Sequence, residues 1–158
     1  MKFIIDAMLG KLARWLRMMG HDAKYSSNLA DKELLNIANK ENRILLTRDF
    51  QLFQKAINQG LKATFIEGKT EPERIAEVAQ KNNIILEVDP DKSNCSVCNT
   101  KLRETSKSEI EEKVEKNTLK YYDKFWLCPN CGKVYWQGAH WKNIETTLKM
   151  AKEKNKEL

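Results

Sequence analysis

Four cysteines in two short hooks constrain this chain more than any other feature of its sequence. Cys95 and Cys98 form one C-x2-C hook, and Cys128 and Cys131 form a second after a gap of 29 residues. Two such hooks can bring four sulfurs to one zinc ion at about 2.3 Å and so complete a tetrahedron. The second hook reads CPNCGK, in which the proline stiffens the turn and the glycine permits a positive φ. The spacing therefore predicts a structural zinc ribbon, whose four thiolates leave no open position for catalysis.

Two other roles for the cysteines, as disulfides or as a redox pair, fit the sequence less well. Paired disulfides are disfavoured in a reducing cytosol. A thioredoxin-type redox pair begins a helix after a strand and needs no second copy.

No apolar run approaches the roughly 18 residues of a membrane span. The opening MKFIID is too short and too soon acidic for a signal peptide, so we expect a cytoplasmic protein that does not associate with membranes.

Apolar strands alternate with amphipathic helices through the first ninety residues, which predicts an α/β fold with a parallel sheet flanked by helices. The expected strands are residues 2–6, 21–25, 43–49 and 63–67, and the expected helices are 8–19, 31–42, 50–59 and 70–82. The first helix is expected to bury the positions Met8, Leu12, Trp15, Leu16 and Met19. We therefore expect an α/β domain over residues 1–90, followed by the zinc ribbon over 91–142.

The remaining segments are polar. Residues 89–94 resemble a linker in composition, and the Lys/Glu-rich stretch 106–120 reads as a solvated insertion, either a loop or a short helix. A β-hairpin is expected around the second hook, from residues 125–126 and 133–136. Residues 143–158 form a separate C-terminal helix that is expected to fray.

Three carboxylates stand out. Asp6 and Asp49 each end an apolar strand, and Asp31 begins a helix. The carboxyl ends of parallel strands share one edge of a sheet, where ligands bind. Converging carboxylates favour a hard cation such as Mg²⁺ or Mn²⁺. Asp31 and Asp49 are also explained as helix N-caps, whereas Asp6 has few structural explanations.

Basic residues lie close to these acids in the sequence. Lys11, Arg14 and Arg17 recur on one side of the first helix, directly after Asp6, and Arg48 precedes Asp49. Such residues can bind phosphates, although a charged stripe is ordinarily a solvated helix face. The net charge of +6 is a weak guide, because four thiolates on one zinc ion offset part of the excess.

The sequence resembles a known family at three places. The segments DAMLGKLARWLRMMGHDAKY, LADKELLNIANKENRILLTRDFQLF and CPNCGKVYWQGAHW occur in the order typical of the Mut7-C family. That family is described as a PIN-like ribonuclease domain followed by a zinc ribbon. The resemblance implies that Asp6, Asp31 and Asp49 take the positions of metal-binding acids. PIN nucleases commonly carry a further acid between the first and third of these positions. The placement of Asp22 does not suggest this ligand, and Glu33 is the remaining candidate, although a step of two residues from Asp31 on a helix faces elsewhere.

The leading hypothesis is a metal-dependent ribonuclease that uses Mg²⁺ or Mn²⁺ and binds RNA. The alternatives are a non-catalytic RNA-binding module of the kind that associates with ribosomes or ribonucleoproteins, and a structural adaptor in which the ribbon recruits a protein. Trp136 and Trp141 are expected to seal the ribbon against the α/β domain, or else to stack on an unpaired base. His140 is expected to be structural.

Overall fold

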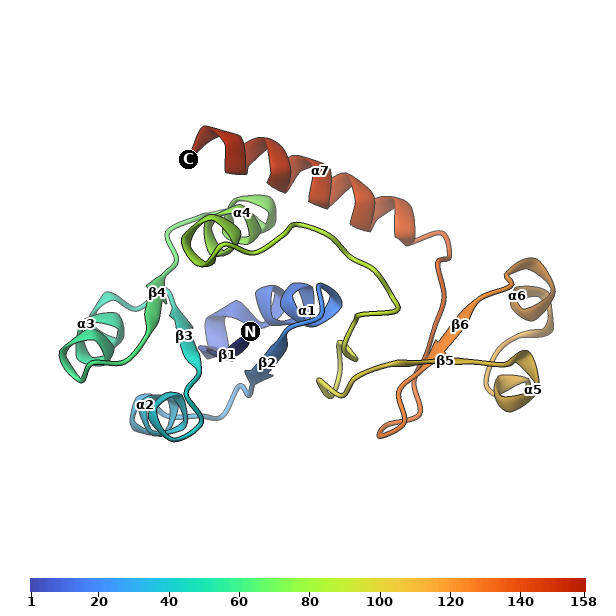
Figure 1. The fold of residues 1–158 in the computed structure, drawn as a ribbon, viewed down its shortest axis with the longest axis horizontal. Helices are drawn as coiled ribbons and strands as arrows, with labels where there is room; N and C mark the ends of the chain where they lie inside the picture. Colours follow the sequence, from blue (N-terminus) through green and yellow to red (C-terminus); the bar gives the residue numbers. More distant parts are fainter.

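The computed structural model describes residues 1–158 and contains an α/β region and a cysteine-containing ribbon beside it (Figure 1). The α/β region is built on one four-stranded parallel sheet in the order β2-β1-β3-β4. Its strands are β1 (Lys2–Ile5), β2 (Asp22–Tyr25), β3 (Ile44–Thr47) and β4 (Ala63–Phe65). The predicted parallel α/β sheet is confirmed, and β2 and β4 form its two edges.

Helices cover both faces of the sheet. They are η1 (Ala7–Leu9), α1 (Gly10–Met18), α2 (Asp31–Lys40), α3 (Phe50–Asn58) and α4 (Glu71–Asn82). The larger core joins one face of the sheet to α1 and α4, and the smaller core joins the other face to α2 and α3. Helix α4 begins with Thr70 and Glu73 in a capping box, as expected of Thr, Pro and Glu at a helix start.

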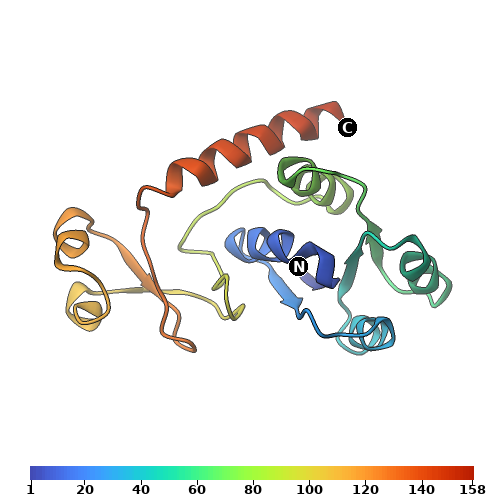
Figure 2. The ribbon, with the colours of Figure 1, turned by 180° about the vertical axis from the view of Figure 1, so that it is seen from behind.

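The last helix, α7 (Trp141–Glu157), packs on the α/β region. It runs alongside α4 across the outside of the α/β region (Figures 1 and 2). Leu148 and Ala151 are buried in the larger core, and Ile144 packs against it. The helix is polar overall because only this narrow stripe meets α4.

Between α4 and α7 the chain forms the ribbon, a three-stranded antiparallel sheet in the order β5-β6-β7. The elements are β5 (Arg103–Thr105), α5 (Lys107–Ile110), α6 (Lys116–Tyr121), β6 (Phe125–Leu127) and β7 (Val134–Tyr135). The predicted hairpin is therefore present as β6 and β7. The insertion is less solvated than predicted, because Ile110 and Val114 pack on Phe125 in a small core.

Two further expectations need correction. Met8 is 67% exposed because a 3₁₀ turn, η1, precedes the α-helix and rotates this residue off its buried stripe. Ser93 and Asn94, expected in a linker, are buried against the end of α1.

None of the helices combines the length and the apolar character of a membrane span. The cytoplasmic location stays a prediction.

Candidate active site and metal centre

Asp6 and Asp49 lie at the carboxyl ends of the neighbouring strands β1 and β3. Asp6 follows β1 directly and its backbone N–H donates to the Leu46 carbonyl at 3.0 Å. Its carboxylate accepts hydrogen bonds from the Ala7 backbone N–H at 2.7 Å and the Thr47 hydroxyl at 2.8 Å. Both strands therefore contribute to holding the Asp6 carboxylate at this edge of the sheet.

Thr47 links the two acids. Its Oγ1 donates to Asp6 Oδ2 and accepts the Asp49 backbone N–H at 2.9 Å, while the residue itself is fully buried. Asp49 Oδ1 caps α3 by accepting the N–H groups of Gln51 and Leu52, whereas Asp49 Oδ2 accepts no hydrogen bond from the protein. The expected capping role of Asp49 is present, and one oxygen stays available to a ligand.

Sequence reasoning missed Thr47, although its position two residues before Asp49, at the end of an apolar strand, was a usable signal. Side chains two residues apart on an extended segment point to the same side. A hydroxyl can serve one acid as donor and the neighbouring backbone as acceptor.

Asp31 does not join this arrangement in the way expected. It is exposed at the first residue of α2, and the N-cap position belongs to Ala30, so Asp31 makes no capping hydrogen bond. The carboxylates of Asp6, Asp31 and Asp49 do not lie within 4.8 Å of one another. Asp31 still places a negative charge in the first turn of α2, where the helix dipole favours it.

The four predicted basic residues fall into different environments. Lys11 and Arg14 are exposed on α1 and pair with no acidic side chain. Arg48 is half-buried, and its guanidinium donates to the Gly68 carbonyl. Arg17 is 7% exposed, and it donates to the carbonyls of Ala23 at 2.9 Å and Ser96 at 2.8 Å.

The expectation for Arg17 therefore needs correction. Its guanidinium is committed to backbone carbonyls of β2 and of the first cysteine hook, and burial lowers its pKa. Its main role is to join the ribbon to the α/β region, because α1 turns this position toward the hook rather than toward solvent.

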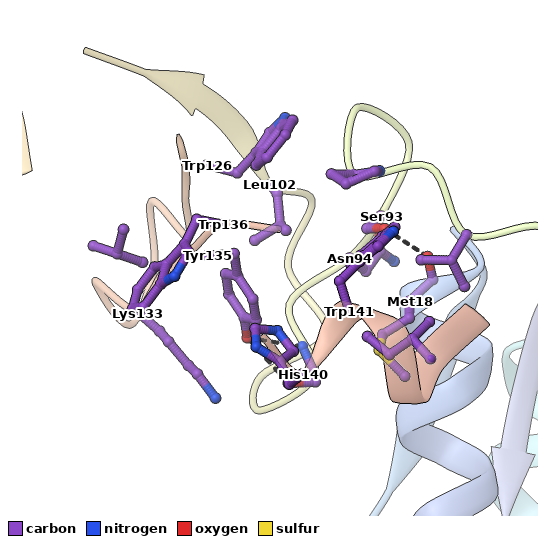
Figure 3. A pocket seen from close by; sticks show the side chains of 15 residues that line it. Met18, Ser93, Asn94, Leu102, Trp126, Lys133, Tyr135, Trp136, His140 and Trp141 are labelled. Atoms are coloured by element: carbon purple, nitrogen blue, oxygen red, sulfur yellow. Dashed lines mark hydrogen bonds between the residues drawn. The ribbon is translucent and has the colours of Figure 1, made fainter. Parts of the chain in front are cut away.

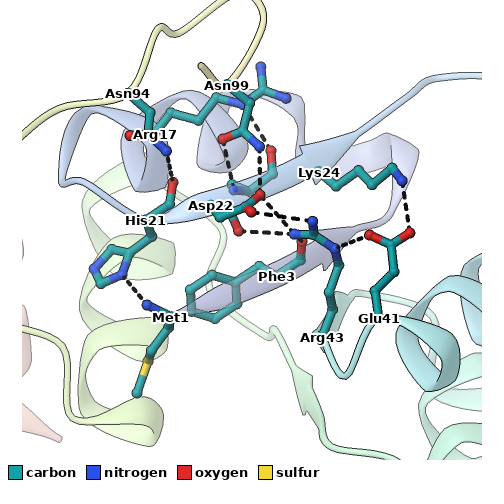
Figure 4. Close-up of polar contacts among 11 residues, drawn as sticks. Met1, Phe3, Arg17, His21, Asp22, Lys24, Glu41, Arg43, Asn94 and Asn99 are labelled. Carbon is teal, nitrogen blue, oxygen red and sulfur yellow. Dashed lines mark hydrogen bonds and ion pairs between the residues drawn. The ribbon is translucent and has the colours of Figure 1, made fainter. Parts of the chain in front are cut away.

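A polar seam continues this junction (Figure 4). Asn99 accepts the backbone N–H of Ala23 on the edge strand β2 at 3.0 Å, and it donates to Asp22 at 2.7 Å. Asp22 also pairs with Arg43 at 2.8 Å. Burial alone would raise the pKa of Asp22, but the hydrogen bonds from Arg43 and Asn99 hold it below the ordinary value. The first cysteine hook thus covers an otherwise open sheet edge.

The cysteine sulfurs form the second site. All four Sγ atoms lie within 4.8 Å of one another, with Cys95 and Cys131 at 3.7 Å and Cys98 and Cys128 at 3.3 Å. A tetrahedron with metal–sulfur bonds of about 2.3 Å requires sulfur separations of about 3.8 Å. Tyr135 supports the site, because its hydroxyl lies 3.0 Å from Cys95 Sγ and 3.1 Å from the Ser96 backbone nitrogen. The cluster therefore fits a metal such as zinc.

Fold and sites together define a class: an α/β protein with an acidic sheet edge and an attached four-cysteine ribbon. The Mut7-C RNAse domain matches residues 1–148, nearly the whole sequence. The chain belongs to the Mut7-C RNAse domain family, as the resemblance in its three motifs indicated. No curated protein and no solved structure gives a match.

Proposed function

We propose that this protein is a metal-dependent ribonuclease whose active site is built on Asp6 and Asp49. The observation that carries the proposal is the Thr47 hydroxyl, which contacts both acids at the carboxyl edge of the sheet. Membership of an RNAse family supports RNA as the substrate. Asp31 would not bind the cation directly but would contact it through a water molecule.

Each residue has a role that follows from its contacts. Thr47 fixes the Asp6 carboxylate and the backbone of Asp49, so both acids are oriented before substrate arrives. Lys11 and Arg14 carry charges with no acidic partner and would bind backbone phosphates near the site. Arg48 keeps donors beyond the one used by Gly68 and would bind a phosphate beside Asp49.

Two acids suit a Mg²⁺ or Mn²⁺ ion, because such ions take one or two carboxylates and fill the rest of their shell with water and substrate phosphate. Asp49 Oδ2 and the Asp6 carboxylate would hold it. The chemistry that the bound cation supplies is activation of water and neutralisation of charge on the phosphate.

Replacement of Asp6 tests the proposal most directly. We expect Asp6→Asn to reduce cleavage of a labelled single-stranded RNA by about 10²-fold or more, the scale on which loss of one preorganised catalytic group acts. Cleavage is measured with added Mn²⁺ and without it, and the bound zinc and manganese are determined on the same samples.

Asp123→Asn is the matched control, because the side chain of Asp123 is 98% exposed on the ribbon, away from the sheet edge. Cleavage that survives Asp6→Asn, or that needs no added metal, would refute the proposed site. Retained zinc in the variant separates loss of chemistry from loss of the fold.

A non-catalytic RNA-binding module is the second candidate. It is favoured by the acid set, because Asp6, Asp31 and Asp49 do not form one cluster within 4.8 Å. Tight, salt-sensitive binding of RNA without cleavage at any metal concentration would support it. Binding of neither RNA nor DNA would instead favour the adaptor role.

A further inference from the structure

An aromatic cavity of about 370 Å³ lies where the ribbon meets α1 and α7 (Figure 3). Its aromatic walls come from Trp126, Tyr135 and Trp136 of the ribbon and from Trp141 at the start of α7. Met18 of α1 and Ile144 of α7 close the α/β side. The volume falls in the lower part of the usual range for small-molecule sites, about 300–1,000 Å³.

The tryptophans do not fill this junction as a sealed core would. Trp126 is buried and its indole N–H donates to Asp91 at 2.9 Å. Trp136 and Trp141 are only half-buried, and their indole N–H groups donate to no protein acceptor. Trp136 packs partly on Phe125, so the rest of its ring, the Trp141 ring and two indole donors without a protein acceptor are available at the cavity wall.

A basic cleft of about 500 Å³ adjoins the cavity. Lys11, Arg14, Arg17 and Lys133 line it, and neither space has an acidic residue in its wall. The two spaces share Ser96 and Lys133, so they meet at the first cysteine hook. Lys133 stands at the boundary, with its Nζ 5.1 Å from the centre of the Tyr135 ring.

The cleft also leads toward the acidic edge. Gly10 and Tyr25 line it, and the Tyr25 hydroxyl donates to the carbonyl of Ala7, the residue that follows Asp6. Stacking surfaces, a stripe of cations and the acid pair thus follow one another along the side of α1.

We propose that this junction binds a single unpaired nucleotide of an RNA strand. Its base stacks on Trp136 or Trp141 in the aromatic cavity, and the adjoining phosphates contact Lys133, Arg14 and Lys11. The charge pattern favours this occupant over a peptide, because a basic cleft without acids beside half-buried indoles matches a polyanion with aromatic bases. The inference rests on the proposed function in taking RNA as the substrate, and it makes the ribbon the part that selects single strands.

Binding is measured in the Asp6→Asn protein, so that affinity is read without cleavage. The probe is a fluorescent 12-nucleotide oligouridylate, and its affinity is followed by anisotropy alongside tryptophan emission. We expect RNA to quench tryptophan emission, and Trp141→Leu or Trp136→Leu to weaken binding about ten-fold. Lys133→Gln should weaken binding and lower the salt dependence by about one unit of slope. Lys62→Gln, an exposed lysine just before β4 at the opposite edge of the sheet, should do neither.

A second probe leaves the protein unaltered, which matters if a tryptophan variant fails to fold. An oligonucleotide of abasic ribose-phosphate units should bind about ten-fold more weakly than oligouridylate and should not quench the emission. Equal affinity for both probes, or RNA binding without quenching, would overturn the proposal and leave the cavity to a protein segment. These results do not depend on cleavage, so failure of the catalytic proposal would be seen separately in the Asp6→Asn assay.

Discussion

The two candidate metal sites differ in how completely the chain builds them. The cysteine cluster supplies four sulfurs within 4.8 Å, which is a whole coordination shell. The acidic edge supplies the carboxylates of Asp6 and Asp49, and Thr47 hydrogen-bonds the carboxylate of the first and the backbone N–H of the second. The remaining positions are left to water or substrate. A closed set of soft ligands holds structure together, whereas an open set of hard ligands leaves room for a reaction. The predictions below test this contrast, beginning with the largest expected effect.

Removal of the ribbon metal should have the largest effect, because structural zinc contributes about 10–16 kcal/mol to the folding of zinc-finger peptides. We expect a chelator to abolish hydrogen-exchange protection in β5–β7. Protection should also fall at β2, where Asn99 accepts the Ala23 N–H and Arg17 binds the Ala23 carbonyl. Strand β3, in the centre of the sheet, is the internal control. Unchanged protection at β2 would mean that the first cysteine hook contacts this strand without stabilising it.

Substitutions at the acidic edge should show how much each residue contributes to RNA cleavage. Thr47→Val keeps the shape of the side chain but removes the hydroxyl, and we expect cleavage to fall about 10–100-fold. It should also cost about 1–3 kcal/mol of stability, because the Asp49 N–H loses its acceptor. Asp31→Asn should lower cleavage about ten-fold or less. Steady-state cleavage and thermal melting measure both effects, and a larger loss for Asp31→Asn than for Thr47→Val would reverse the ranking.

Substitution of Arg17 should mainly lower stability, whereas substitution of Arg14 on the same helix should mainly weaken RNA binding. Arg17→Gln should destabilise the fold by about 2–3 kcal/mol, since the carbonyls of Ala23 and Ser96 lose their charged donor. Arg14→Gln should change stability by less than about 0.5 kcal/mol, yet weaken RNA binding. Urea unfolding and RNA titration of both variants provide the comparison. Equal stability of the Arg17 and Arg14 variants would contradict the proposal that Arg17 joins the ribbon to the α/β region.

His21 should give the smallest effect, a mild loss of stability in acid. Burial first, and the N-terminal amine second, lower the pKa of His21 to about 4. The folded pKa lies below the ordinary value of about 6.5, so the contribution is full above pH 6.5 and declines as the pH falls toward 4. Between pH 7 and pH 5 the loss should be about 1 kcal/mol, because solvent screens the partly exposed imidazole. His21→Gln should remove this part of the pH dependence of urea unfolding.

Local sequence patterns predicted the strands, most helices and the clustering of the four cysteines well. These features depend on near neighbours, such as the capping box at Thr70 or the turn of a CPNCG hook. The patterns failed where packing between distant segments decides. Arg17 is buried because the first cysteine hook, about eighty residues later, supplies its acceptors.

The same limit explains the other misses. The stripe of Leu148 and Ala151 is too narrow to mark α7 as a core helix until α4 is known to lie beside it. At the acidic edge, the positions of Asp6 and Asp49 after two apolar strands predicted correctly that both lie at the carboxyl edge of the parallel sheet, and the structure shows that the two strands are neighbours. The sequence positions could not show that Thr47 links them, or that Asp31 begins its helix without capping it.

The position of α7 has a consequence for how the protein is made. The chain is synthesised from its N-terminus, so the face of α4 that meets Leu148 and Ala151 stays open until the ribbon has left the ribosome. The larger core of the α/β region is therefore completed only after the segment that follows the ribbon has been made. Interrupted synthesis would release chains in which the acidic strands are present but the larger core is unfinished, and such chains expose apolar surface to chaperones and proteases.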